Sequence, residues 1–202
     1  ESPLKESSFL NLKNCIFKWK YPLWYSHKIA VANTTLLETA RSGIWYTTDI
    51  VIRNSLIEAP KTFRRASGIY LENVSLPNAQ ETFWNCKDIV LKNVNAKGDY
   101  FGMNAENVSI ENFTLSGNYA FDGGRNIEIH NATMTSKDSF CLFRTTLEIV
   151  ASKKAPSLST KPILLKKRSI SFIFYTSLQF FYTSNYNLIF IYSFSHLTSY
   201  FN

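Results

Sequence analysis

The sequence is poor in residues that crosslink a chain or interrupt it: its 202 residues include three cysteines, seven glycines and six prolines. Cys15, Cys86 and Cys141 are odd in number and follow no metal-ligand spacing. This predicts free, buried thiols in a reducing compartment, and hence a cytoplasmic protein. A glycine-rich phosphate loop, a zinc pattern and a helix-turn-helix signal are also missing from the sequence. We therefore predict no cofactor and no metal.

Acidic residues are missing from the last quarter of the chain. All 15 Asp and Glu residues lie at or before Glu148, together with 16 Lys and Arg, whereas six basic residues and no acidic ones follow Val150. The net charge of +7 therefore comes mainly from the end of the chain. Such a charge is poor evidence that the rest binds nucleic acid, and we predict no nucleic-acid partner.

What the sequence does contain is one short pattern that occurs seven times: apolar, any, apolar, any, Asn. Its asparagines are spaced 19 to 21 residues apart, at Asn14, Asn33, Asn54, Asn73, Asn93, Asn112 and Asn131. A period near 20 in which apolar residues alternate is typical of a β-solenoid, where each repeat is one coil. We predict an all-β fold, a right-handed single-stranded parallel β-helix of about seven coils of roughly 18–21 residues.

Alternation within each strand predicts which side chains point inward. Residues i, i+2 and i+4 of a strand share a face, so Ile29, Val31 and Asn33 are expected to point together into the core. A buried amide needs a partner, and the amide of the next coil can supply it. The repeated asparagines therefore predict a buried ladder of side-chain hydrogen bonds with a structural role.

A second apolar strand recurs 8 to 11 residues after each ladder asparagine. Its outward positions, which should follow one another about 4.8 Å apart along one face, are Trp24, Trp45, Arg64, Trp84, Gly102 and Phe121. Exposed rings flanked by charge can bind the apolar face of a sugar. We take Trp24, Trp45, Arg64 and Trp84 as candidate ligand-binding residues and polysaccharide as the candidate partner. The alternative is that loops fold over these rings and bury them.

The repeats also resemble a known family. The segments NCIFKWKYPLWYS, SLIEAPKTFRRASGI, ETFWNCKDIVLKNV and NAKGDYFGMN look like an uncharacterised bacterial family of right-handed parallel β-helix proteins, a domain of unknown function similar to the pectin-lyase-like superfamily. The resemblance runs from residue 1 to about residue 139. It implies the fold and no activity.

The superfamily resemblance suggests β-elimination on an acidic polysaccharide as one chemistry. An arginine beside acids could neutralise a uronate carboxylate and assist proton abstraction. The candidate catalytic residues are Arg64, Arg65, Glu81, Asp99 and Asp122. Surface salt bridges are the alternative explanation for such pairs. We expect a non-catalytic carbohydrate- or surface-binding scaffold, with a polysaccharide lyase or hydrolase as the alternative, and exposure of Trp24, Trp45 and Trp84 as the discriminating observation.

The repeat pattern fails after residue 140, which divides the chain into three segments. Residues 1–140 form the repeat domain, which we expect to be incomplete at both ends. Residues 141–168 form a basic segment of linker-like composition, and residues 169–202 carry no formal charge and are rich in Phe and Tyr. This composition favours an out-of-frame or non-native tail, with no further coil beyond the one carrying Asn131. A membrane-associated segment and an unrecognised structure are the alternatives, and we expect no membrane partner unless the tail is native.

Overall fold

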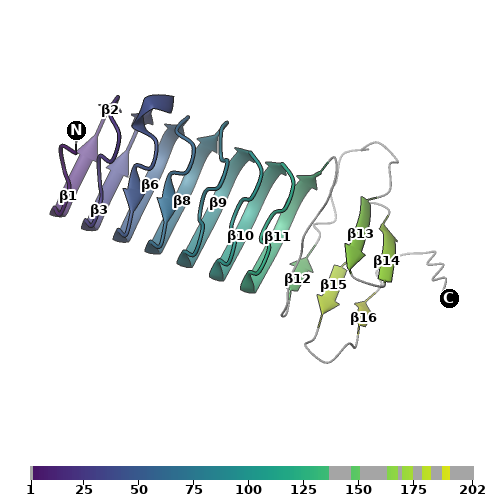
Figure 1. Ribbon diagram of the computed structural model, residues 1–202. Coiled ribbons are helices and arrows are strands. Elements are labelled where there is room, and N and C mark those ends of the chain that lie inside the picture. Colours follow the sequence, from purple (N-terminus) through teal and green to yellow (C-terminus); the bar gives the residue numbers. More distant parts are fainter. Residues whose placement is uncertain are drawn as a thin grey trace.

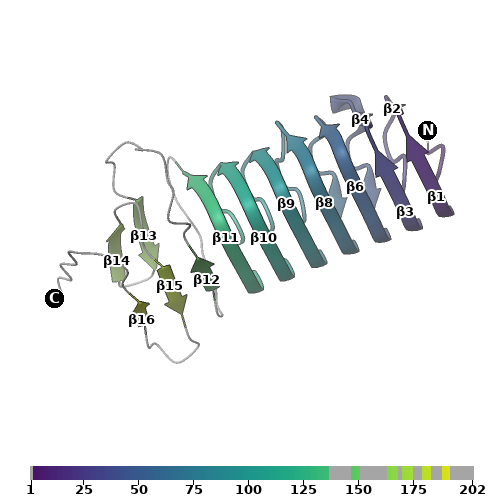
Figure 2. The ribbon, with the colours of Figure 1, turned by 180° about the vertical axis from the view of Figure 1, so that it is seen from behind.

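The computed structural model describes residues 2–136 in full, together with the backbone of residues 147–150, 163–167, 170–174, 179–182 and 188–191. Cys141, which the sequence predicts to be a free, buried thiol, lies outside the described residues. Long parallel strands, one from each coil, form the main sheet of the molecule (Figures 1 and 2). They are β1 (Ser8–Lys13), β3 (His27–Ala32), β6 (Thr48–Ile57), β8 (Ser67–Leu76), β9 (Lys87–Lys97), β10 (Glu106–Ser116) and β11 (Arg125–Thr135).

Shorter elements complete the early coils. The strands β2 (Ile16–Phe17) and β4 (Thr35–Leu36) pair with each other, and β4 also pairs with the second half of β6. On another side of the coil, β5 (Ile44–Trp45) pairs with β7 (Phe63–Arg64). One short 3-10 helix covers Glu38–Ala40. All these strand pairs are parallel, so the predicted parallel β-solenoid of about seven turns is confirmed.

The core is a set of columns running along the solenoid axis. The alternating apolar residues of each pattern are in register, as Ile50 with Ile69, and Ile69 with Ile89. Their side chains are at most 1% exposed. Each coil covers the edge of the next, so the coils on either side complete the burial of these residues.

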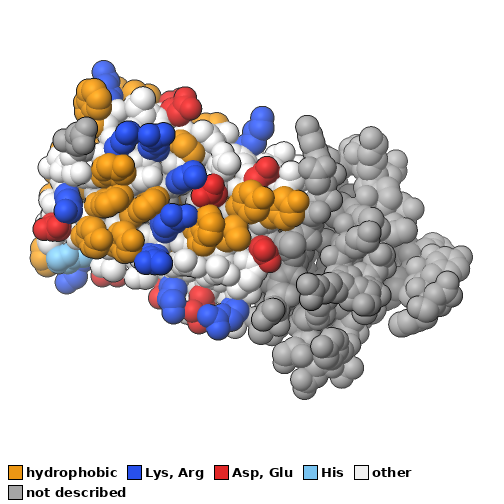
Figure 3. Space-filling view, in the orientation of Figure 1, with side chains coloured by type: hydrophobic (Ala, Val, Ile, Leu, Met, Phe, Trp, Pro, Cys, Tyr) orange, Lys and Arg blue, Asp and Glu red, His pale blue; other side chains and the backbone are white. Residues whose placement is uncertain are grey.

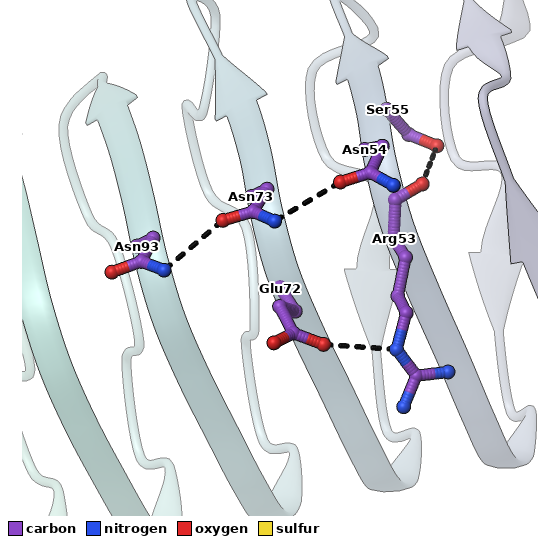
Figure 4. Close-up of polar contacts among 6 residues, drawn as sticks. All are labelled: Arg53, Asn54, Ser55, Glu72, Asn73 and Asn93. Atoms are coloured by element: carbon purple, nitrogen blue, oxygen red, sulfur yellow. Dashed lines mark hydrogen bonds and ion pairs between the residues drawn. The ribbon is translucent and has the colours of Figure 1, made fainter.

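The ladder asparagines differ from the prediction in orientation. Each of the seven has a positive φ, for example 55° at Asn73 and 48° at Asn54. A left-handed residue ends the simple alternation of a strand, so the chain bends there and the asparagine side chain is exposed rather than buried. The ladder itself is confirmed, because Asn73 donates to Asn54 at 3.0 Å and Asn93 donates to Asn73 at 3.0 Å (Figure 4). It continues through Asn112 and Asn131, whereas no side-chain hydrogen bond within residues 2–136 joins Asn14 or Asn33 to it.

A second side-chain ladder stands at the start of the long strands. Positive φ values recur there, and the later coils place Asp88, Asn107 and Asn126 in that column. The Asn107 amide donates to Asp88 at 2.8 Å, and the Asn126 amide donates to Asn107 at 3.1 Å. Asp and Asn tolerate the left-handed conformation better than other residues with a side chain, which suits them to these bends. The sequence analysis did not identify this ladder.

Another strand follows the coil of Asn131, contrary to expectation. β12 (Leu147–Val150) pairs in parallel with β11, with Leu147 opposite Ile127 and Ile149 opposite Ile129. The apolar alternation of Leu147 and Ile149 therefore continues the pattern for part of one coil.

The described strands of the later segments pair antiparallel. β13 (Ile163–Lys167) pairs with β14 (Ile170–Phe174), and β15 (Gln179–Tyr182) pairs with both β12 and β16 (Leu188–Ile191). Whether residues 141–202 are a native sequence stays a prediction.

Candidate functional site

Trp24, Trp45, Arg64 and Trp84 form one continuous stack along the axis, as their spacing predicts. Trp24 and Trp45 are stacked with ring centroids 5.3 Å apart and an angle of 10° between planes. The guanidinium of Arg64 lies 4.8 Å from the Trp45 centroid and 4.5 Å from the Trp84 centroid. Arg64 is therefore held between two indole rings, a geometry that favours both stacking and cation–π attraction.

The ring faces in this stack are mostly occupied by the protein itself. Both faces of Trp45 are taken, by Trp24 on one side and Arg64 on the other. Its indole N–H donates to the Lys61 carbonyl at 2.7 Å, and the indole N–H of Trp24 donates to the Ser42 carbonyl. The three rings are half-buried, and Trp45, with both faces covered, has only its edge left for solvent. Edges offer a sugar less apolar area than a flat face does.

The outward column does not continue through Gly102 and Phe121. Phe121 is 1% exposed and packs edge-on against Phe101 at a centroid distance of 5.5 Å. Both Phe121 (φ 56°) and Gly102 (φ 71°) are left-handed, and each is buried together with the residue before it, so alternation fails at these bends. A Cβ on Gly102 would lie 2.4 Å from the Phe121 ring, so glycine makes room for that ring in the core.

Two of the candidate catalytic residues contact each other. Arg64 lies 3.7 Å from the carboxylate of Glu81, which also pairs with Lys61 at 2.9 Å. Asp99 accepts a hydrogen bond from the backbone N–H of Asn118 at 2.8 Å. These two acids are thus held in local contacts.

The other two candidates are exposed. Arg65 and Asp122 both lie at the surface, and neither forms an ion pair within residues 2–136. The structure therefore brings together Arg64 and Glu81 but does not join all five candidates in one cluster.

Aromatic residues beyond the predicted column extend it into a band. Figure 3 shows hydrophobic side chains running lengthwise over one face, with basic and acidic side chains beside and between them. We define the aromatic band as Tyr21, Trp24, Tyr25, Trp45, Tyr46, Trp84, Tyr100 and Tyr119. Across neighbouring coils, Trp24 stacks on Trp45, Tyr25 on Tyr46 and Tyr100 on Tyr119. Tyr25 and Tyr46, for instance, are stacked at 4.7 Å with a 2° angle between planes. The tyrosines were missed because only one position of the second strand was followed along the repeats.

Three basic residues beside the band have no acidic partner in the part of the chain with described side chains. Lys20 and Arg41 hold equivalent positions in consecutive coils, and Arg65 follows Tyr46 in the next coil of the tyrosine column. Lys20 and Arg41 precede the tryptophan column and Arg65 follows it, so the three cations flank the band on its two sides. Positive charge on both sides favours the approach of an anion, and we call these residues the flanking cations (Lys20, Arg41 and Arg65).

A groove runs along the asparagine ladder, on different elements from the band. Its volume is about 640 Å³. It is lined by Asn33, Thr34, Thr35, Asn54, Ser55, Leu56, Asn73, Val74, Ser75, Asn93 and Asn95. The bend at each ladder asparagine opens this hollow, which a ladder buried in the core could not have formed. We call it the ladder groove.

The cysteines agree only in part with the prediction. Cys15 and Cys86 are free thiols, Cys86 being buried and Cys15 half-buried. Burial raises the pKa of Cys86 to about 12, so this thiol stays protonated and unreactive at neutral pH. Cys86 thus acts as a small apolar residue of the core.

The arrangement as a whole defines a parallel β-solenoid with stacked side-chain columns on its surface. A family model described as a protein of unknown function (DUF3737) matches residues 1–150, and the chain belongs to this family. No curated protein and no solved structure matched the chain significantly.

Two properties of the described residues concern membranes and metals. None of their helices combines the length and apolar character required to cross a membrane. No group of three or more His, Cys, Asp or Glu side chains within them is placed to hold a metal ion.

Proposed function

We propose that the domain is a non-catalytic scaffold that binds acidic polysaccharide across the aromatic band. The observation that carries this proposal is the set of flanking cations, Lys20, Arg41 and Arg65, on the two sides of the aromatic rings. Uronate carboxylates of a linear glycan would approach these cations while the sugar rings cover the ring edges. The likeness of the repeats to pectin-lyase-like proteins is a further support for a carbohydrate ligand.

The surroundings of Arg64 favour binding over catalysis. Both faces of its guanidinium are covered by indole rings, and Glu81 occupies its edge. An arginine held in this way positions its neighbours rather than meeting a reacting carbon. Lyase chemistry would also need a base close to the arginine, and Asp99 is engaged with the backbone of Asn118.

The test compares two double variants with the same loss of charge. Arg41→Gln with Arg65→Gln removes two of the flanking cations, one from each side of the band. Lys13→Gln with Lys97→Gln removes two exposed cations elsewhere that also have no ion pair among residues 2–136. The measurement is retention of the full chain on immobilised polygalacturonate and hyaluronate. We expect the first pair of changes to weaken retention about tenfold, corresponding to about 1.4 kcal/mol, and the second to leave it nearly unchanged.

Two results would contradict the proposal. If both double variants lose the same amount of retention, the attraction comes from the overall net charge and there is no specific site. Product formation from either polymer, lost in Arg64→Ala, would indicate a lyase instead of a binding scaffold. Since binding here relies on exposed charges, raising the salt concentration should weaken it.

A further inference from the structure

We infer that the ladder groove is a second binding site, specific for a neutral, hydroxyl-rich chain such as a neutral polysaccharide. The inference goes beyond the proposed function, because the groove lies along β6, β8 and β9 and contains none of the residues of the aromatic band. It also concerns a ligand of different charge.

The lining of the groove carries no charge. Nine of its eleven residues are polar, and all nine are Asn, Ser or Thr. The nearest charged residues neutralise each other: Arg53 pairs with Glu72 at 2.9 Å beside the ladder (Figure 4). A charged ligand would therefore leave water without gaining an opposite charge, which is unfavourable.

The ladder amides offer donors and acceptors in equal number. In Asn73, one amide N–H is used on Asn54 and the oxygen accepts from Asn93. A second N–H and a second lone pair remain on this exposed side chain. Hydroxyl groups both donate and accept, so they match this alternation, whereas a carboxylate or phosphate could use only the donors.

The repeat of the groove suits an extended polymer. The same amide recurs in each coil about 4.8 Å further along the axis, so a chain lying parallel to the axis meets equivalent contacts repeatedly. Leu56 stands between Thr35 and Ser75 in the same column and is half-exposed, which gives an apolar contact for the C–H groups of a sugar ring. The volume of about 640 Å³ falls within the usual range of ligand sites.

The test blocks the groove and uses a control in the same column. Asn95 lines the groove, and Thr114 is its partner in the next coil, exposed like Asn95 but outside the groove. Tryptophan is accepted at exposed strand positions, so Asn95→Trp and Thr114→Trp should both fold. Ser75→Tyr is an independent blocking variant, and a thermal melt confirms folding of all three.

The measurement is binding of the full chain to an array of neutral glucans, xylans and mannans alongside acidic glycans. We expect at least one neutral glycan to bind with an affinity that is unchanged between about 50 mM and about 500 mM salt. Asn95→Trp should weaken this binding at least tenfold and Thr114→Trp less than twofold.

Failure of this inference can be told apart from failure of the proposed function. The groove site is overturned if no neutral glycan binds, if folded Asn95→Trp and Ser75→Tyr bind like the parent, or if Thr114→Trp loses as much. Loss of neutral-glycan binding in Arg41→Gln with Arg65→Gln would also overturn it, because the site would then be the aromatic band. Loss of acidic-glycan binding alone in that variant concerns only the proposed function.

Discussion

Replacing Asn73 by leucine tests whether an exposed ladder stabilises the solenoid. The change removes two side-chain hydrogen bonds, to Asn54 and from Asn93, each worth about 0.5–1.5 kcal/mol and here at the lower end because the groups are exposed. It also forces leucine to adopt a φ of 55°, which costs about 1–2 kcal/mol and which asparagine tolerates better. Together these effects predict a loss of about 2–3 kcal/mol.

The assay is thermal and urea unfolding of the parent and three variants. A loss of this size should lower the melting temperature by about 5–10 °C. Asn73→Gly removes the same hydrogen bonds without the strain and should fall between Asn73→Leu and the parent. Ser75→Leu, at a half-exposed strand position two residues on, should change stability by less than about 0.5 kcal/mol. If Asn73→Leu and Ser75→Leu unfold at the same temperature and urea concentration, neither the ladder nor the left-handed bend stabilises the fold.

Four further outcomes follow from the stack, the thiols and the core. Trp45→Ala should destabilise the domain by about 2 kcal/mol, because ring contacts on both faces and an indole hydrogen bond are lost. Trp19→Ala, at a ring that is 72% exposed, should not destabilise it. Equal melting curves of the two variants would contradict this. In native protein Cys15 should react with an alkylating reagent before Cys86. Burial raises the pKa of Cys86 from 9.0 to about 12, so the thiol of the unfolded chain ionises at a lower pH than that of the folded chain. Stability should therefore fall as the pH rises from about 9 towards about 12. Urea unfolding of the parent and Cys86→Ala at several pH values checks this, and the same dependence of stability on pH in both proteins would argue against it. Gly102→Val should prevent folding or lower stability by several kcal/mol, because the added side chain meets a buried ring at a left-handed position, and a soluble variant with the parental melting temperature would refute this packing.

The period of the sequence was sufficient to predict the coils, their register and the ladder partners. The orientation of the ladder could not be predicted by alternation, since the rule of two residues per repeat holds only while φ stays negative. A left-handed residue such as Asn54 or Asn93 shifts the alternation, and a period of two residues takes no account of such residues. The frequency of Asn, Asp and Gly at such positions was a signal that could have been read, and it would also have revealed the ladder through Asp88 and Asn107.

The sequence predicted which residues of the candidate site lie in one column but not how their side chains pack against each other. Equal spacing placed Trp45, Arg64 and Trp84 in one column, and the structure has them there. Whether neighbouring rings lie flat on each other or open to solvent depends on side-chain rotamers, which spacing does not specify. The ladder groove was beyond reach for a related reason, because its walls are residues that alternation assigned to the interior.

The left-handed corners have a consequence for how this chain acquires its structure. Among the described residues, 27 other than glycine have positive φ, at a cost of about 1–2 kcal/mol for most residue types and less for the asparagines and aspartates among them. A single coil has few contacts to offset that cost, whereas a coil laid against a finished neighbour gains a complete set of strand pairs and stacked columns at once. The first pair of coils is then the slow step, and every later coil is templated by the edge already formed. Folding should thus nucleate at one pair of coils and propagate coil by coil along the axis, and unfolding should begin at the ends of the solenoid.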